Sequence, residues 1–285
     1  MPMNIAGRIF FPALAALSLL SSAAVAGPPR PVVVELFTSQ GCADCPPADI
    51  FLGKLAQRPG ILAITLPVTY WDMLGWKDTL ARDDNTRRQK AYAQAMGRGG
   101  VYTPQMIVDG VSDVVGSRIA SVEAAIAARE DAIEAFFPAT VAVASREAAP
   151  PPAAMAAAPT GKPQPLDPVV PIVVRETPDE MHITIGAVDG AHNANATVWM
   201  FHLQSQVTVA IPRGENAGHT LTYRNVAGDV KAVGVWKGKT LTLTLPKSAM
   251  AGLPHDGVAI VVQQGGYGHI IGAAYLARPD FYAQR

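Results

Sequence analysis

Two cysteines three positions apart are the residues of this chain with the clearest capacity for chemistry. Cys42 and Cys45 are its only cysteines, and their spacing allows either a closed disulfide or an open dithiol. In disulfide exchange a thiolate attacks first, and a second thiol then resolves the mixed disulfide. We assign attack to Cys42, on the turn side, and resolution to Cys45. A permanent disulfide that closes a tight turn is the alternative.

The residues that follow Cys45 predict the start of a helix. Pro46 and Pro47 lack backbone N–H groups, which a helix tolerates in its first turn. The unpaired N–H groups and the dipole at a helix start stabilise a thiolate. Asp44 opposes this effect, because it puts a negative charge between the two thiols. A helix that begins at Pro46 would also leave Cys42 in the turn, with less help from the dipole.

Three further residues are candidates for supporting roles. Glu35 is the only charged residue in the apolar run 32–37, which predicts a buried strand. A buried carboxyl group has a raised pKa and makes a workable general acid or base, whereas a Glu35 that points to the surface would have no such role. Trp71 and Asp72 belong to a loop with three aromatic residues, 70–76. This loop either packs on the core or faces a substrate.

Apolar spacing in the first half predicts alternating strands and helices. Asp109-Gly110 between two apolar runs is a strong hairpin signal. The expected order is therefore strand, helix, strand, helix, hairpin, helix. The expected elements are a strand from Val32, a helix over 46–57, a strand over 61–68, a helix over 83–96, hairpin strands over 105–108 and 111–115, and a helix over 117–135.

Residues from about Pro31 to Ala135 resemble a thioredoxin-fold domain, because a C-x-x-C follows the first strand and a Thr-Pro pair precedes the hairpin. The resemblance implies that the Thr103–Pro104 peptide bond is cis and lies against the cysteine pair. It also implies that the backbone of Thr103 is free to pair with an extended substrate segment. An ordinary trans proline in a loop is the alternative.

The sequence departs from thioredoxins at the motif itself. Thioredoxins carry Gly-Pro between the cysteines and a Trp beside them, whereas this chain has Ala43-Asp44 and Gly41 at these places. Glu35 lies one position further from the cysteines than the buried acid of that family. The resemblance therefore implies a fold and thiol chemistry without a matching acid.

Further short motifs lie in both halves of the chain: Leu36–Cys42, Cys45–Ala48, Tyr70–Asp72, Gly75–Asp78, Arg88-Gln89, Tyr102–Gln105 and Gly214–Asn216. In these residues the chain resembles the DUF1223 family of secreted proteins of unknown function. This resemblance implies thiol chemistry and names no substrate.

From Val169 onward, short β runs separated by turn residues predict an antiparallel sandwich or barrel. Four of these runs are expected as separate strands over 197–203, 207–211, 221–223 and 230–236. Leu241–Leu245 alternates cleanly, which indicates one buried face. The glycine-rich loops at 214–219 and 265–269 are expected as tight turns, and a role in covering the cysteine site is the alternative. All six histidines lie in this half without a spacing typical of metal ligands, so we expect no metal site and no cofactor.

The N-terminal residues predict a secretory signal. Arg8 supplies a positive charge, Ile9–Leu20 is an apolar run, and Ala24–Ala26 is a small-residue cleavage site. The apolar run is too short to span a membrane, so we expect no stable membrane anchor after cleavage. Export places the cysteines in an oxidising compartment, the periplasm in a Gram-negative source or the medium otherwise.

Length and charge limit the remaining possibilities. The chain has 285 residues with 23 basic and 23 acidic side chains, so no basic footprint for nucleic acid is indicated. The length suits two domains. We expect a signal peptide at 1–26, an α/β thioredoxin-like domain at 27–137 and an all-β sandwich-like domain at 138–285. A Pro/Ala-rich segment at about 146–168 is expected to be exposed.

The favoured function is thiol–disulfide exchange on another exported protein. One rival is a non-catalytic binding module that keeps a structural disulfide. The other is a chaperone that binds a soft metal such as Cu(I) through both thiolates. Met73 and Met106 are isolated and no histidine lies in the first half, which counts against the chaperone. The partner, the direction of exchange and the role of the second half stay open.

Overall fold

The computed structural model describes residues 30–136, 169–191, 194–250 and 255–277. The expected signal peptide and the expected exposed segment at 146–168 lie outside these residues. The elements of the first half are β1 (Val32–Thr38), α1 (Pro46–Leu55), β2 (Ile61–Pro67), α2 (Asp83–Ala95), β3 (Gln105–Val108), β4 (Ser112–Val115) and α3 (Ile119–Phe136). Those of the second half are β5 (Ile172–Glu176), β6 (Glu180–Ile185), β7 (Ala196–Ala210), β8 (Thr220–Trp236), β9 (Leu241–Pro246), the short 3₁₀-helix η1 (Lys247–Met250), β10 (Gly257–Gln264) and β11 (Ile270–Ala277).

The elements expected in the first half are all present, with ends shifted by a few residues. In the second half, the short strands expected over 197–203 and 207–211 are one strand, β7, and those expected over 221–223 and 230–236 are one strand, β8. Gln204 and Gln206 of β7 pair with Val226 and Arg224 of β8, and the ladder continues past register shifts at Val198/Trp199 and His202/Leu203.

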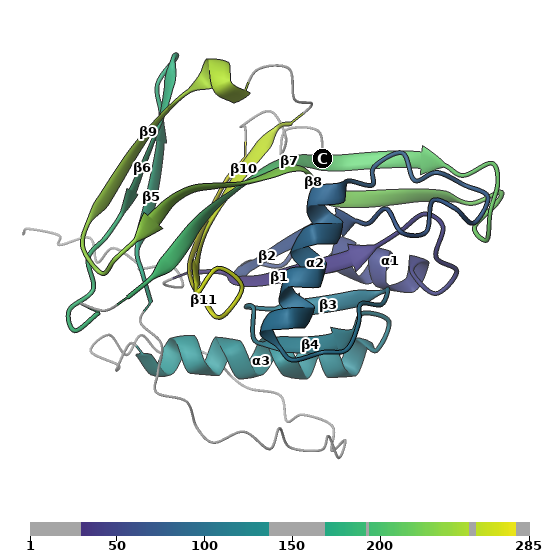
Figure 1. Ribbon diagram of the computed structural model, residues 1–285, viewed down its shortest axis with the longest axis horizontal. Helices are drawn as coiled ribbons and strands as arrows, with labels where there is room; N and C mark the ends of the chain where they lie inside the picture. The colour runs from purple at the N-terminus through teal and green to yellow at the C-terminus, as the bar shows by residue number, and fades with distance from the viewer. Residues whose placement is uncertain (1–29, 137–168, 192–193, 251–254, 278–285) are drawn as a thin grey trace, which may run out of the picture.

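The expected fold class, an α/β thioredoxin-like domain followed by an all-β sandwich-like domain, is wrong. Strands of both halves form one mixed eight-stranded sheet in the order β11-β10-β7-β8-β2-β1-β3-β4 (Figure 1). The junction is a parallel pairing of β2 with β8, where Thr65 Oγ1 donates to the Arg224 carbonyl at 2.6 Å. The other strands, β5, β6 and β9, form a separate three-stranded sheet. The apolar alternation marks the strands, but it does not specify which strand lies beside β2.

β1 lies inside the large sheet, and all seven of its residues are buried. Val34 and Leu36 belong to the core formed with α1 and α3. Phe37 points to the opposite face, where it packs with Tyr92 of α2 and with Phe201 of β7. This alternation follows from the two-residue period of a strand. The core on the α2 face is therefore built from both halves of the chain.

The three-stranded sheet covers part of the large sheet. Its residues Met181, Ile183 and Ile185 share a core with Val198 of β7 and Ile260 of β10. In Figure 1 this small sheet stands at one end of the molecule, away from α1. The second half thus supplies both an extension of the first sheet and a cover for that extension. The boundary expected at 137/138 stays a prediction, because residues 137–168 lie outside the described part.

The far end of the β7–β8 hairpin reaches the region of α1 and the loops of the first half (Figure 1). Ile211 and Tyr223 of this end form a small core with Trp76 and Leu80 from the loop after β2. The hairpin therefore brings second-half residues to the cysteine motif. Within the described residues, none of the helices combines the length and the apolar character needed to cross a membrane.

Candidate functional site

Cys42 and Cys45 form a disulfide in the loop that joins β1 to α1. Cys45 is the N-cap residue of α1, and its carbonyl accepts hydrogen bonds from the N–H groups of Ala48 and Asp49 at 2.9 and 3.1 Å. The prediction that the helix begins at Pro46 is confirmed. Cys42 is 1% exposed and Cys45 is fully buried. The pair is therefore closed and covered in this structure.

Asp49 carries a buried carboxyl group one helical turn after Cys45. Neither of its oxygens has a hydrogen-bond partner of good geometry among the described residues, although the Thr38 hydroxyl lies close. Burial raises the pKa of Asp49 to about 8, the Thr38 hydroxyl partly offsets this, and the charge of Asp78 adds to it. The group is therefore poised to gain or lose a proton near neutral pH.

Tyr223 of β8 completes the surroundings of Asp49. Its side chain is 1% exposed, and its hydroxyl has no hydrogen-bond partner among the described residues. Burial raises the pKa of Tyr223, and the nearby charges of Asp49 and Asp78 raise it further. The polar groups around Asp49 thus lie in a dry environment that favours the neutral carboxyl.

The sequence patterns missed Asp49, because a polar residue early in a helix is usually solvent-exposed. Its one signal is the spacing of four from Cys45, which places both residues on one side of α1.

Asp72 acts on the cysteine loop through a second aspartate. Its Oδ1 accepts a hydrogen bond from the N–H of Asp78 at 3.0 Å. Asp78 in turn accepts hydrogen bonds from the N–H groups of Gln40 at 2.7 Å and Leu80 at 2.8 Å. Burial raises the pKa of Asp78, and these backbone hydrogen bonds lower it in part. The structure therefore places Asp72 in the support of Gln40, two residues before Cys42.

Trp71 borders the cysteine loop directly. A Cβ atom added at Gly41 would lie 3.2 Å from the Trp71 Cβ and 3.4 Å from its carbonyl oxygen. Only a residue without a side chain fits beneath this tryptophan without displacement. Trp71 is partly buried and also packs against the core on the α2 face. Trp71 thus packs on the core and also borders the cysteine loop, and the substrate-facing role of its loop stays a prediction.

The Thr103–Pro104 peptide bond is cis, as predicted. The Pro104 carbonyl accepts a hydrogen bond from the Gly116 N–H at 2.9 Å. A Cβ atom added at Gly116 would lie 3.1 Å from the Cβ of Ala48, three residues after Cys45. This chain of contacts places the Thr103–Pro104 turn beside the first turn of α1, and therefore on the side of the sheet that carries the cysteine pair.

Four polar atoms without hydrogen-bond partners of good geometry, counted among the described residues, lie near this turn. They are Tyr70 Oη, Trp71 Nε1, Gln89 Oε1 and Thr103 Oγ1. Burial raises the pKa of Tyr70, and the Gln89, Thr103 and Trp71 side chains lie close enough to lower it. Gln89 already donates its Nε2 to the Tyr102 carbonyl at 2.7 Å. The group therefore holds buried donors and an acceptor without partners of good geometry beside the cis turn.

Glu35 is buried, so the interpretation that it points to the surface is wrong. It forms an ion pair with Arg88 of α2, with contacts at 2.5 and 3.1 Å, and accepts a hydrogen bond from the Tyr92 hydroxyl. The Arg88 guanidinium lies 5.0–5.6 Å from the ring centres of Tyr92, Trp199, Phe201 and Tyr267. Glu35 lies on the face opposite Leu36 and α1. The structure does not bring it to the cysteine pair.

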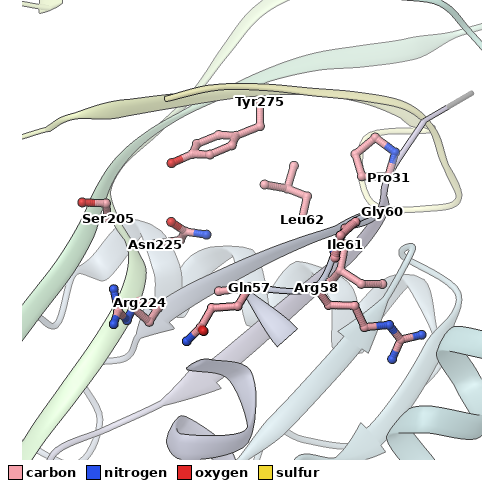
Figure 2. Close-up of a pocket in the computed structure, with 12 residues that line it drawn as sticks. Pro31, Gln57, Arg58, Gly60, Ile61, Leu62, Ser205, Arg224, Asn225 and Tyr275 are labelled. Carbon is pink, nitrogen blue, oxygen red and sulfur yellow. The ribbon is translucent and has the colours of Figure 1, made fainter. Parts of the chain in front are cut away.

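A cavity of about 350 Å³ lies elsewhere, between the start of β2 and strands of the second half (Figure 2). Tyr275 and Leu62 form an apolar part of its wall, and Ser205 and Asn225 lie at one end. Ser205 is hydrogen-bonded to Asp256, and the Asn225 amide donates to the Ala63 carbonyl. Because these polar groups are already paired, the cavity is a weaker candidate than the cysteine site.

Within the described residues, no group of three or more His, Cys, Asp or Glu side chains is arranged to hold a metal ion. His202 and His255 have ring centres 4.9 Å apart, and His202 lies 3.6 Å from Asp229. Burial lowers the pKa of His202, and the neighbouring His255 lowers it further. This histidine pair is remote from the cysteine motif in sequence and in the sheet order.

Comparison with known proteins gives a family without an assigned activity. The model of the family described as "Protein of unknown function (DUF1223)" matches residues 33–167 and 142–263. A crystal structure of a protein from Agrobacterium tumefaciens is similar, with a TM-score of 0.64 and 32% identity over 86% of this chain and 93% of that chain. HBP35 of Porphyromonas gingivalis has a TM-score of 0.49 and 13% identity over 87% of this chain and 75% of that chain. No curated protein matches.

Proposed function

Because the chain belongs to the DUF1223 family, whose function is unknown, we propose an activity from its site: thiol–disulfide exchange with another exported protein through Cys42 and Cys45. The observation that carries the proposal is the disulfide at the start of α1 with the unpartnered, buried carboxyl of Asp49 one turn later. A disulfide that served only to close a turn would need no such group.

The exchange moves two electrons between the cysteine pair and the partner. In the reduced protein, the Cys42 thiolate attacks a partner disulfide, the partner S–S bond breaks, and a mixed disulfide forms as one partner thiolate leaves. Cys45 gives its proton to the Asp49 carboxylate and attacks Cys42 Sγ. The Cys42–Cys45 disulfide forms, and the second partner thiolate leaves. The two partner thiolates take up protons from solvent and from Asp49.

The reverse direction uses the same groups. A partner thiolate attacks Cys42 of the closed disulfide, and Cys45 leaves as a thiolate. Asp49, whose pKa is about 8, is mostly protonated at pH 7 and supplies a proton to this leaving group. An acid with its pKa near the working pH can serve both directions, which an ordinary exposed aspartate with a pKa of about 3.9 cannot do.

The residues around the pair suit a polypeptide partner. Thr103 and Pro104 lie beside the first turn of α1, and Trp71 borders Gly41. We assign the Thr103 backbone to main-chain pairing with an extended segment of the partner, and Trp71 to its contact surface. Asp72 has a positioning role through Asp78, because it touches the cysteine loop only through that residue.

Trapping of mixed disulfides tests the roles of the two cysteines. Cys45→Ser removes the resolving thiol, so this variant should accumulate mixed disulfides with exported proteins on non-reducing gels. Cys42→Ser should trap far fewer, although it has the same number of thiols. Equal trapping by both variants would contradict the assignment.

One observation favours a second candidate, a non-catalytic binding module with a structural disulfide. Both cysteines are almost completely buried, as expected of a bond that stays closed. The reduction potential of the pair separates the two functions. Structural disulfides lie below about −300 mV, and exchange sites lie above that value.

A further inference from the structure

A loop from the second half contacts the backbone of the cysteine motif. The Asn216 Nδ2 group donates one hydrogen bond to the Gln40 carbonyl and one to the Cys42 carbonyl, each at 2.9 Å. Asn216 lies in the loop between β7 and β8, 174 residues after Cys42. A single side-chain amide therefore fixes the backbone on both sides of Gly41, directly at the residue assigned to attack.

Asn216 is the only buried residue in the stretch 212–220, whose other residues are exposed. The loop is held in shape by its own backbone hydrogen bonds, including Ala217 N–H to Gly214 carbonyl at 3.1 Å and Gly218 N–H to Ile211 carbonyl at 2.8 Å. Besides Asn216, the loop contacts the first half through Gly214, which lies against Trp76, so it can move as a unit once these two contacts are broken. Asn216 is thus the buried anchor of a loop whose other residues are exposed to solvent.

A second contact joins the same loop to the same backbone. Gly214 has φ +83°, and a Cβ atom added there would lie 2.9 Å from the Trp76 Cβ. Trp76 in turn donates its Nε1–H to Gln40 Oε1 at 2.8 Å. The loop tip therefore packs on a tryptophan that also holds Gln40. Any substituent at Gly214 pushes the tip away from the cysteine motif.

From these contacts we infer that the β7–β8 loop is a displaceable cover of the disulfide and that Asn216 is its positioning residue. The inference rests on the proposed function, since it states how the cysteine pair of that function becomes accessible. In the closed form Asn216 holds the Cys42 backbone, and the pair is shielded from solvent. A partner reaches Cys42 when Asn216 leaves the Gln40 and Cys42 carbonyls.

The two freed carbonyls define the chemistry of that partner. The Gln40 carbonyl needs a hydrogen-bond donor in place of the Asn216 amide, because a buried carbonyl without one costs about 1–3 kcal/mol. The Cys42 carbonyl keeps the hydrogen bond from the Cys45 N–H at 3.2 Å and can accept one further donor. Main-chain N–H groups of an extended polypeptide supply donors at suitable spacing, as in strand addition. Small disulfides such as oxidised glutathione offer fewer such donors. The cover therefore selects for an extended polypeptide segment next to the partner disulfide or thiol.

The rate of reduction by a small phosphine, tris(2-carboxyethyl)phosphine, measures access to the disulfide in the full-length protein. The phosphine takes up oxygen from water to become the phosphine oxide, and the disulfide becomes two thiols. Asn216→Asp keeps the side-chain shape but replaces the donor by a carboxylate that faces two carbonyl oxygens. We expect reduction of this variant at pH 8 to be about tenfold faster than that of the wild-type protein.

The pH profile distinguishes a positioning role from a general loss of structure. At low pH the aspartate introduced at this position is protonated and can donate again to one carbonyl. The ratio of variant to wild-type rates should therefore fall toward one between pH 8 and pH 5, since its carbonyl neighbours raise its pKa. A ratio that stays high at every pH would overturn the role of the donor.

Gly214→Ala tests the cover without changing Asn216 and decides the matter if Asn216→Asp fails to fold. It should speed reduction at all pH values, because the added Cβ displaces the tip from Trp76. Glu215→Gln is the matched control, an exposed change in the same loop that should leave the rate unaltered. Reduction of Gly214→Ala at the wild-type rate would overturn the cover.

The outcomes also separate this inference from the proposed function. Faster reduction of the loop variants, together with no mixed disulfides in Cys45→Ser, would retain the cover and overturn the exchange activity. Mixed disulfides in Cys45→Ser, together with wild-type reduction rates in both loop variants, would retain the activity and overturn the cover.

Discussion

Asp49 and Glu35 are two fully buried carboxyl groups on opposite sides of one sheet, and their neighbours give them different chemistry. Glu35 faces the Arg88 guanidinium and the Tyr92 hydroxyl, so its charge is compensated. Among the described residues, the polar groups near Asp49 include the Thr38 and Tyr223 hydroxyls and the Asp78 carboxyl, and burial raises the pKa of Asp49 to about 8. Glu35 therefore suits a fixed structural role, and Asp49 suits proton transfer.

Asp49 should make the stability of the protein depend on pH. Its pKa is about 8 in the folded chain and about 3.9 in the unfolded chain, so the folded state binds more protons between these values. The unfolding free energy should therefore fall as pH rises from about 4 to 8, by at most about 1.4 kcal/mol per pH unit. Asp49→Asn abolishes this dependence. Urea unfolding should show that the unfolding free energy of Asp49→Asn rises relative to that of the wild-type protein from pH 5 to pH 8.

Asp44→Asn is the matched control, because Asp44 is an exposed aspartate between the two cysteines. It should leave the slope of stability against pH almost unchanged. The proton-transfer role of Asp49 adds a kinetic readout, since Asp49→Asn should slow exchange most at neutral pH. A wild-type pH slope in Asp49→Asn would show that the carboxyl does not titrate in this range.

Removing the Arg88 side chain should strongly destabilise the protein. Arg88→Ala leaves Glu35 buried without its cation, a change that typically costs about 3–5 kcal/mol. Arg87→Ala, on the exposed side of the same helix, should cost less than about 1 kcal/mol, because its ion pair with Asp84 is solvated. Denaturant titration of both variants measures the difference. Similar losses for the two would mean that the buried pair contributes no more than the exposed one.

At the scale of elements, the sequence predicts much of the first half, because the signals there are local. The prolines after Cys45 mark the start of α1, and Asp109-Gly110 marks the turn between β3 and β4. The pairing of β2 with β8 could not be predicted in this way. Thr65 and Arg224 are 159 residues apart. The alternation of apolar and polar residues predicts each strand, but it does not indicate which other strand pairs with it.

The residues of the candidate site also fall into those that local sequence motifs predict and those that depend on long-range packing. Cys42, Cys45 and the cis bond at Pro104 follow from short motifs in the sequence. Asn216 does not, because its role depends on the path of a 15-residue strand, β7, to the cysteine loop. Asp49 was missed because its polarity indicates exposure, whereas β8 buries it beside Tyr223.

The turn between β3 and β4 joins the halves at a second place. Asp109 has φ 51°, its carbonyl accepts from the Ile270 N–H at 2.9 Å, and its carboxylate binds Arg30 and the Val33 N–H. Gly110 has φ +70°, and a Cβ atom added there would lie 2.1 Å from the Gly268 carbonyl oxygen. The turn therefore needs both a left-handed backbone and an absent side chain.

Gly110→Ala should destabilise the protein far more than Gly60→Ala. Both glycines have positive φ, so both variants lose about 1–2 kcal/mol to the left-handed backbone. Gly60 has open space around its added Cβ, whereas Gly110 meets a backbone oxygen, which typically adds about 1–3 kcal/mol. Thermal or urea unfolding of the pair gives the difference. Equal losses of unfolding free energy would mean that the backbone at Gly110 and Gly268 moves apart at little cost to admit the added Cβ.

At the scale of the whole molecule, the described residues should unfold in one step. The core on the α2 face mixes Phe37 and Leu62 of the first half with Phe201 and Val261 of the second. Neither half can keep this core alone. Urea unfolding should therefore show one transition, and amide exchange in β2 and β8 should report similar opening free energies.

A cut within 146–168 gives an independent test. If this segment is exposed as expected, mild proteolysis should cut there and leave two fragments that elute together in gel filtration. Separate elution of folded fragments, or loss of β8 protection before that of β2, would contradict a shared core.

The contact of Asn216 with the cysteine loop also sets an order of events during synthesis. Asn216 follows Cys42 by 174 residues, so it is made long after the cysteine pair. At ~5–20 residues per second this interval is on the order of ten seconds. During it the nascent chain presents two uncovered thiols to any oxidant it meets. If export delivers the chain to an oxidant from its N-terminus onward, the disulfide forms most readily before the loop that carries Asn216 has folded over it.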